Sequence, residues 1–232
     1  MVIIKLITGT QIKRFYECSK ERELRKHNSS LKGAKWGKIC EKLYLDILDK
    51  GNSQIFEIVQ SHINSNFQDL TIVESTKIIG NLAFLLKSMK NTNSQEIYKS
   101  NQIISDDKFA VEIDLIIRDK SGTGFIREFK SYSGPSYYAW NSDIAQLATQ
   151  NIVLSHKLNT VIYYGEIVYL GNKKIIPINT KPYIKSINFA RRKMIEGTNK
   201  IDCEHCSFLD FPCYNHVRYK NSTIETKLIH CL

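Results

Sequence analysis

The sequence has few of the residues that separate structural units, with only 4 prolines and 11 glycines among 232 residues. No stretch is rich in both, and no internal repeat or low-complexity tract is visible. These absences argue against a flexible interdomain linker and against a repeat array. The chain is 42% hydrophobic, which is enough to bury a sizeable core, so we expect a single domain over residues 1–232.

The chain also lacks apolar runs of the ~20 residues that a membrane-spanning helix needs. Its start, MVIIKLITGT, has no charged leader before the apolar run and no small-residue cleavage pattern after it. We therefore expect an intracellular, cytoplasmic protein. Because a reducing compartment disfavours structural disulfides, the six cysteines favour metal binding or catalysis.

Acidic residues are in the minority, with 23 Asp and Glu against 33 Lys and Arg. The formal net charge is +10 and the sequence pI is near 9.2. A strongly basic chain favours polyanionic partners such as nucleic acid over acidic small molecules alone.

The period of the apolar residues changes twice along the chain. Residues 1–95 have helical spacing, residues 96–184 alternate as strands around one helix, and residues 185–232 return to a helix followed by a cysteine cluster. The order of elements predicts an α/β domain with a mixed central sheet. We expect helices over 8–28, 35–48, 75–89, 142–158 and from 185, and strands over 95–104, 109–119, 124–132, 160–170 and 173–180.

The stretch EFKSYSG places an acid and a base on the same face of one predicted strand. Glu128 and Lys130 are two residues apart, and a hairpin turn over DKSGTG can bring Asp114 across to meet them. Carboxylate oxygens suit Mg²⁺ or Mn²⁺, and the main-chain carbonyl of Phe129 could add a further ligand. A metal in such a site can activate water for attack on phosphorus. The alternative is a surface ion pair on an edge strand.

The motifs EIDLI, EFK and SDIAQLATQNIVLSHKL, in this order, resemble those of the PD-(D/E)XK nucleases of the RecB type. The resemblance implies a restriction-endonuclease-like core with helices on both faces of a mixed sheet. It also implies that Asp114 and Glu128 bind metal and that Lys130 assists. Gln146 would contact DNA or position the lysine. One departure is Gln150, which stands where that family usually has a tyrosine.

The cysteines extend the resemblance to most of the chain. Cys203, Cys206 and Cys213 form a C-x2-C-x6-C cluster, and Cys18 lies near the other end. This pattern resembles the CRISPR-associated protein four family, in which one amino-terminal and three carboxy-terminal cysteines hold a 4Fe-4S cluster that joins the termini. A local zinc site of the three clustered cysteines with His216 is the alternative.

A second departure from that family concerns the metal site. The family usually has a histidine ligand on its second helix, and Cys40 stands in its place. Cys40 could replace that ligand, or Glu41 could take the role. Cys40 could instead be a core residue on the apolar stripe of its helix, or the metal site could have weakened.

Two kinds of segment could contact DNA. The loop after the EFK strand is aromatic, and basic runs occur in two predicted helices. Aromatic rings beside a metal site can stack on unpaired bases or cover the core edge, and basic runs can follow phosphates or face solvent. The aromatic residues are Tyr132, Tyr137, Tyr138 and Trp140, and the basic ones are Arg22, Arg25, Lys26 and Arg191 to Lys193.

By resemblance, we expect a metal-dependent DNA nuclease, an exonuclease on single-stranded DNA or single-stranded ends. It would act in CRISPR spacer acquisition, with CRISPR adaptation proteins as partners, or in archaeal or viral DNA processing. A DNA-repair or junction endonuclease of the same fold is one alternative. The other is a catalytically silent nucleic-acid-binding subunit of a larger complex.

Overall fold

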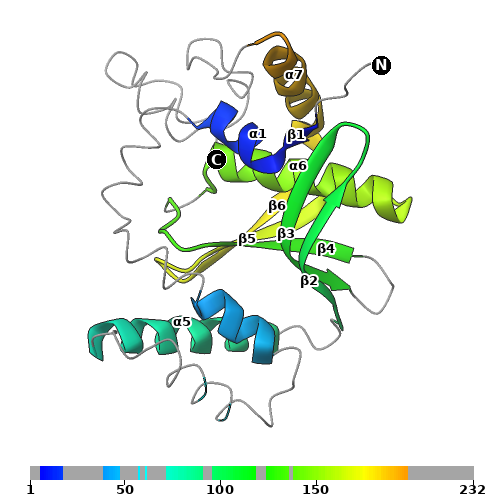
Figure 1. The fold of residues 1–232 in the computed structure, drawn as a ribbon. Coiled ribbons are helices and arrows are strands. Elements are labelled where there is room, and N and C mark those ends of the chain that lie inside the picture. Colours follow the sequence, from blue (N-terminus) through cyan, green and yellow to red (C-terminus); the bar gives the residue numbers. More distant parts are fainter. Residues whose placement is uncertain are drawn as a thin grey trace, which may run out of the picture.

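The structure, a computed structural model, describes most of the central part of the chain (Figure 1). The described residues are 6–17, 39–47, 57, 61, 72–90, 96–118, 124–135 and 138–197.

A mixed β-sheet lies at the centre of the molecule, as the sequence predicts, and has six strands among the described residues. The second, third and fourth strands form an antiparallel meander. After helix α6 (Asn141–Leu158), the fifth strand runs parallel to the fourth, and the sixth is antiparallel to the fifth. The strands are β1 (Ile7–Thr8), β2 (Glu96–Ser105), β3 (Phe109–Arg118), β4 (Gly124–Lys130), β5 (Tyr164–Tyr169) and β6 (Lys174–Asn179).

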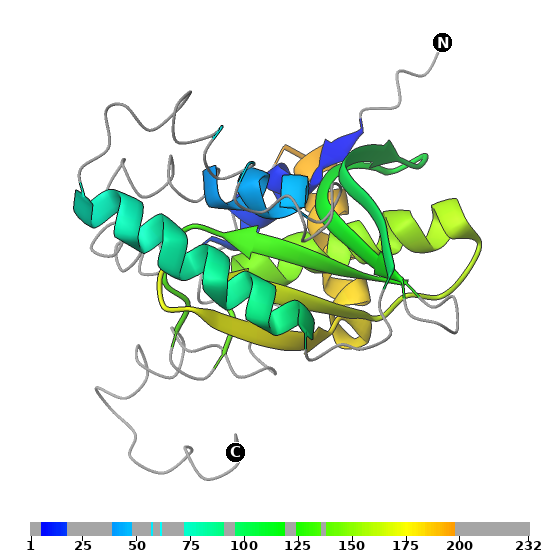
Figure 2. The same cartoon turned by 90° about the horizontal axis from the view of Figure 1, so that it is seen from below.

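Helices cover both faces of this sheet (Figures 1 and 2). One face carries α1 (Gly9–Tyr16), α6 and α7 (Ile184–Ile195), with the 3₁₀ turn η2 (Lys181–Tyr183) leading into α7. The other face carries α5 (Ile72–Lys90) and the helical segment 39–47. A sheet buried on both sides needs apolar residues on both, and β4 is accordingly buried at every position.

The buried apolar residues form two clusters, one on each face of the sheet. We call the first the α6-side core; it includes Ile12, Phe15, Ile126, Leu147 and Ile187. We call the second the α5-side core; it includes Cys40, Leu43, Ile78, Phe129 and Val168. Burying each large aliphatic side chain contributes about 1.5–3 kcal/mol, so both faces contribute to holding the sheet in place.

The first helix differs from the prediction, which ran from residue 8 to residue 28. It begins as expected, with Thr8 as a capping residue: its hydroxyl accepts from the Gln11 amide at 3.1 Å, and Gln11 Oε1 accepts from the Thr8 amide at 2.7 Å. It ends at Tyr16, because Glu17 is extended, so the predicted end is wrong. The Tyr16 hydroxyl donates to the Ser186 carbonyl at 2.6 Å, a tertiary contact that helix propensity cannot anticipate.

Helix α6 lies close against the sheet and carries residues of the site described below. Gly165 on β5 permits this approach, since a Cβ there would come within 2.9 Å of Leu147 Cδ1. Asn159 ends the helix in the left-handed conformation, with φ 49°. No helix in the described ranges is long and apolar enough to cross a membrane.

Candidate active site

Strands β3 and β4 bring two carboxylates of the predicted site together. Leu115 pairs with Arg127 across the antiparallel ladder, so the next positions, Asp114 and Glu128, are neighbours. Asp114 Oδ2 also accepts a hydrogen bond of 2.7 Å from the main-chain amide of Phe129. The hairpin therefore fixes Asp114 against the strand that carries the E-x-K motif, as the spacing in the sequence predicts.

Glu128, Lys130 and Gln146 form one hydrogen-bonded group. Lys130 Nζ lies 2.6 Å from Glu128 Oε1 and donates to Gln146 Oε1 at 2.9 Å. Gln146 Nε2 in turn donates to Glu128 Oε1 at 2.7 Å. Glu128 is 3% exposed and Lys130 is 6% exposed. The sequence left open that Glu128 and Lys130 form a surface ion pair on an edge strand. That alternative is wrong, because β4 is a central strand and both side chains are buried.

Gln150, one helical turn after Gln146, completes the contacts of Glu128. Its Nε2 atom donates to Glu128 Oε2 at 2.7 Å and to the main-chain carbonyl of Glu112, also at 2.7 Å. Both carboxylate oxygens of Glu128 therefore accept hydrogen bonds from side chains of α6. The sequence marked Gln150 only as a departure from a family pattern; its i, i+4 spacing from Gln146 was the available signal.

The pKa values of the ionisable side chains in the site are shifted by burial and by neighbouring charges. The pKa of Asp114 is raised well above its usual value by burial, and the nearby acids Glu128 and Glu41 raise it further. Burial alone would lower the pKa of Lys130, but the carboxylates of Glu128, Asp143 and Asp114 outweigh it, so this pKa is raised. Lys130 is therefore a buried ammonium held by acids.

Asp143 is a second buried acid, which the sequence did not single out. Its Oδ1 atom lies 3.0 Å from Lys13 Nζ and 3.9 Å from Lys130 Nζ, and it accepts from the Tyr132 hydroxyl at 2.5 Å. The Tyr169 hydroxyl donates to its Oδ2 atom at 2.9 Å. Asp143 thus links α1 to the lysine of the E-x-K motif. An acid in the first turn of a helix is so common that nothing in the sequence signalled this role.

Cys40 lies in the α5-side core and does not contact solvent. Burial, with a further contribution from Glu41, raises the pKa of its thiol to about 12. The position of Cys40 among apolar side chains fits the core-packing interpretation of this residue.

The aromatic residues of the loop after β4 have different environments. Trp140 is 4% exposed and packs in the α6-side core, which favours the interpretation that its ring covers the core edge. Tyr132 directs its hydroxyl to Asp143, and Tyr138 is half-buried. The basic residues Arg191 to Lys193 lie on α7. The following predicted site residues lie outside the described residues: Cys18, Cys203, Cys206, Cys213, His216, Tyr137, Arg22, Arg25 and Lys26.

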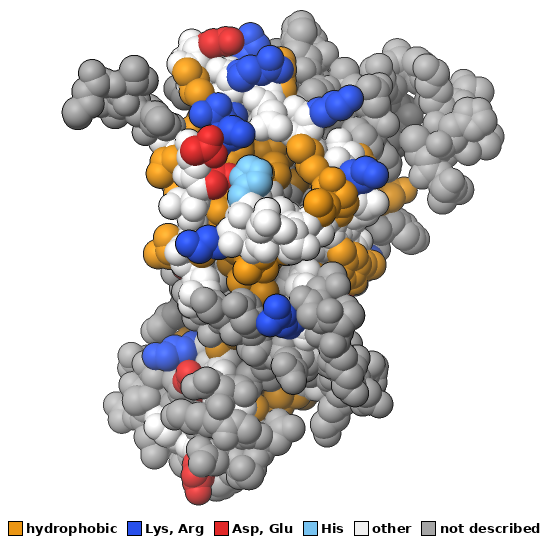
Figure 3. Space-filling view, turned by 90° about the vertical axis from the view of Figure 1, so that its right-hand side faces the viewer, with side chains coloured by type: hydrophobic (Ala, Val, Ile, Leu, Met, Phe, Trp, Pro, Cys, Tyr) orange, Lys and Arg blue, Asp and Glu red, His pale blue; other side chains and the backbone are white. Residues whose placement is uncertain are grey.

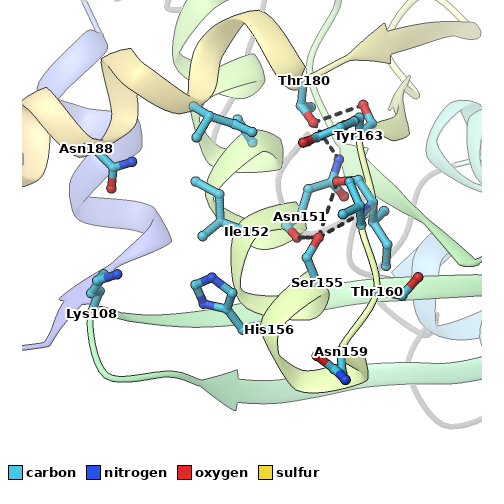
Figure 4. A pocket seen from close by; sticks show the side chains of 14 residues that line it. Lys108, Asn151, Ile152, Ser155, His156, Asn159, Thr160, Tyr163, Thr180 and Asn188 are labelled. Carbon is cyan, nitrogen blue, oxygen red and sulfur yellow. Dashed lines mark hydrogen bonds between the residues drawn. The ribbon is translucent and has the colours of Figure 1, made fainter.

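A pocket of about 500 Å³ lies beside α6, on the side of this helix that faces away from Gln146 and Gln150 (Figure 4). The residues of α6 that line it, among them Asn151, Ser155 and His156, are out of phase with Gln146 and Gln150, so the pocket is separate from the acidic site. Its other walls come from Lys108, from the segment between α6 and β5, and from α7. The sequence did not predict this pocket.

At the edge of this pocket, His156 Nδ1 lies 2.6 Å from Asp106 Oδ2. Ligand atoms of Asp106, Asp107 and His156 all lie within 4.8 Å of one another, so these three side chains could hold a metal ion. On this face of the molecule a histidine lies beside acidic side chains and among hydrophobic ones (Figure 3). The sequence did not reveal this group because its members come from two segments about 50 residues apart.

Comparisons with known proteins add little to this geometry. No protein-family model and no curated protein matches the sequence. Among solved structures, one described as "Crystal structure of SSO0001" is similar over 90% of this chain and 85% of that chain, with 16% sequence identity and a TM-score of 0.40. This likeness is too distant to assign a fold family, and the name SSO0001 states no activity.

Proposed function

We propose that this protein is a metal-dependent DNA nuclease with a PD-(D/E)XK core, acting as an exonuclease on single-stranded DNA or single-stranded ends. The observation that carries the proposal is the group of Asp114, Glu128, Lys130 and Gln146, which come from β3, β4 and α6 and of which Glu128 and Lys130 are buried. Burying this much charge is costly, and natural proteins retain such clusters mostly where they serve a function.

The order of the elements supports the same proposal. An antiparallel meander of β2, β3 and β4 is followed by α6 and then by β5 parallel to β4. This is the arrangement expected for a nuclease core of the resembled type, with the E-x-K motif on a central strand and the glutamine on the crossover helix. We take residues 96–184 as the core on this basis.

The residues present suit Mg²⁺ or Mn²⁺. Asp114 and Glu128 offer carboxylate oxygens and Phe129 offers a main-chain carbonyl, all of them the hard ligands that these ions prefer. Burial raises the pKa of Asp114, and the acids Glu128 and Glu41 raise it further, so a divalent cation bound here would favour the ionised carboxylate. A bound divalent ion would acidify a water molecule and offset negative charge on the scissile phosphate.

In the proposed hydrolysis, Lys130, Gln146 and Asp143 have different roles. Lys130 keeps its proton on Nζ and can stabilise the charge that develops on the phosphate or orient the attacking water. Gln146 holds Lys130 and Glu128 in their relative positions through its amide group. Asp143, in the first turn of α6, lies 3.9 Å from Lys130 Nζ and, after Glu128, helps to keep this ammonium charged.

We further propose a 4Fe-4S cluster held by Cys18, Cys203, Cys206 and Cys213, joining the two ends of the chain. Four thiolates are a standard ligand set for such a cluster. A zinc site of the three clustered cysteines with His216 is the alternative. The setting inferred from the resemblance is CRISPR spacer acquisition, with adaptation proteins as partners, or archaeal or viral DNA processing.

A silent nucleic-acid-binding subunit is the second candidate function, and one observation favours it. Cys40 stands where the resembled family has a metal-ligating histidine, and it is buried in the α5-side core, so the site would lack that ligand. The net charge of +10 would then serve binding alone.

Cleavage assays on site variants test the nuclease proposal. The purified protein is incubated with end-labelled single- and double-stranded DNA, with and without Mn²⁺, alongside Asp114→Asn, Glu128→Gln and Lys130→Met. We expect both carboxamide variants to lose cleavage, because a metal ligand is lost, and circular dichroism checks that each variant is folded. Lys130→Met should lower the rate more than the affinity for DNA.

The matched control is Glu112→Gln, which neutralises an exposed acid on β3 two residues before Asp114 and should cleave like the wild type. Cleavage by Glu128→Gln at the wild-type rate would refute the assignment of the site. Mn²⁺-independent DNA binding without any cleavage would favour the silent subunit.

A further inference from the structure

Gln150 is held in one orientation by two contacts of its amide nitrogen. This nitrogen lies 2.7 Å from Glu128 Oε2 and 2.7 Å from the Glu112 carbonyl oxygen, and the side chain is fully buried. Both partners are acceptors, so the amide NH₂ must face them and the assignment of its nitrogen and oxygen follows. Gln150 is thus a donor to Glu128.

The two glutamines of α6 each donate a hydrogen bond to a different carboxylate oxygen of Glu128. Gln146 donates to Oε1, which also accepts from Lys130, whereas Oε2 accepts from Gln150. Two residues one turn apart on a helix project to the same side, so a single rigid element supports both oxygens. The Glu112 carbonyl, on β3 beside Asp114, fixes the other side of the Gln150 amide.

This orientation leaves one polar atom of Gln150 unsatisfied. Within the described part of the chain, the buried Oε1 atom of Gln150 has no hydrogen-bond partner. An unsatisfied buried acceptor typically costs about 1–3 kcal/mol, and such atoms call for an explanation. An apolar residue of similar length would remove this cost, but it would also remove the donor to Glu128.

We propose that Gln150 is a positioning residue that fixes the carboxylate of Glu128 for metal binding. The proposal rests on the assignment of Glu128 as a metal ligand. Without Gln150, Glu128 keeps donors at Oε1 only, and its carboxylate can rotate about the bond to its methylene group. Residues that orient metal ligands in this way are worth about 10–100-fold in metal affinity or activity.

The test measures Mn²⁺ affinity directly, by titration calorimetry, and compares it with cleavage at increasing Mn²⁺ and with thermal stability. The variants are Gln150→Met, which keeps the length and removes both polar groups, and Gln150→Asn, which keeps an amide one methylene shorter. We expect each to bind Mn²⁺ about 10–100-fold more weakly. The rate at saturating Mn²⁺ should fall less than the affinity.

Asn151→Leu is the matched control. Asn151 is the next residue of α6, is also buried, and likewise has an amide oxygen without a partner among the described residues, but it faces the pocket (Figure 4). Its amide nitrogen donates to Thr180 Oγ1 at 2.9 Å. The control variant should lose thermal stability and keep the wild-type affinity for Mn²⁺.

Glu128→Gln separates the two proposals. If the wild type binds Mn²⁺ no better than Glu128→Gln, the metal site itself is wrong. If Glu128→Gln loses Mn²⁺ while both Gln150 variants bind it as the wild type does, the metal site stands and the role of Gln150 is overturned. A lower melting temperature in the Gln150 variants, with unchanged Mn²⁺ affinity, overturns it as well.

Discussion

Charged side chains are buried at the centre of this protein, where apolar ones are the rule. Glu128, Lys130 and Asp143 are all buried. Each is paired: Lys130 contacts both acids, and Tyr132 and Tyr169 donate to Asp143. Buried ions remain ionised only when charge or hydrogen bonds compensate them, so these residues depend on one another.

A substitution at Cys40 tests whether this residue packs in the core or ligates the metal. Its thiol lies in the α5-side core without solvent contact, so Cys40→His inserts a larger, polar ring into a closely packed site. We expect a loss of about 1–3 kcal/mol in the free energy of unfolding, with cleavage per folded molecule unchanged. Urea denaturation and the cleavage assay measure the two effects.

Cys40→Ala serves as the control, because it removes the thiol without adding volume and should also cleave normally. Higher activity of Cys40→His in Mg²⁺, or a change of metal preference, would show instead that this position ligates the metal.

At the scale of elements, a buried ion pair joins two parallel strands of the sheet. Arg127 on β4 is 1% exposed and its guanidinium contacts Glu166 Oε2 on β5 at 2.7 and 2.9 Å. Tyr44 and Ser88 lie 3.4 Å from the same guanidinium. β4 therefore presents the acid and base of its E-x-K motif to α6 and an arginine to the opposite face.

Glu166→Ala should destabilise the protein by about 3–5 kcal/mol, because it leaves the buried arginine without its carboxylate partner. The comparison is Glu196→Ala, which removes the exposed partner of Lys193 on α7 and should cost about 0–1 kcal/mol. Chemical denaturation of both variants measures the difference. Equal losses in the two variants would show that the strand pair does not depend on this ion pair.

At the scale of the whole molecule, residues from distant parts of the sequence meet around α6. α1 and α7 both pack against it, and the Tyr16 to Ser186 hydrogen bond joins positions 170 residues apart. The described part of the chain therefore already connects its two ends on one face of the sheet. The proposed cluster would add a covalent connection between the same regions.

Cys18 decides whether such a connection exists. Closing a loop that spans most of the chain is worth about 5 kcal/mol by analogy with disulfides, out of a typical total of about 5–15 kcal/mol. Cys18→Ser should remove the visible absorbance that makes the cluster-containing protein brown, lower its iron content and promote aggregation. Wild type, Cys18→Ser and His216→Ala are purified without oxygen, and iron, zinc and visible absorbance are measured. If Cys18→Ser keeps its metal while His216→Ala loses zinc, the cluster proposal fails.

Local patterns in the amino-acid sequence were enough to predict the α/β class and most of the elements. Period-2 and period-3.6 patterns act locally, so the α/β order, the mixed sheet and the approximate bounds of α5, α6 and β3 were predictable. The spacing of Asp114, Glu128 and Lys130 around a hairpin also predicted their meeting, because strand geometry fixes which side chains share a face.

The tertiary structure decided what depends on contacts between distant segments. Periodicity could not show that Ile113 packs in the α6-side core while Leu115, two residues later, packs in the α5-side core. Nor could it show that Asp143 meets Lys13, or that Gln150 reaches Glu128, since these distances depend on how α1 and α6 lie on the twisted sheet. A local pattern specifies an element and its faces; only packing specifies which buried polar groups become partners.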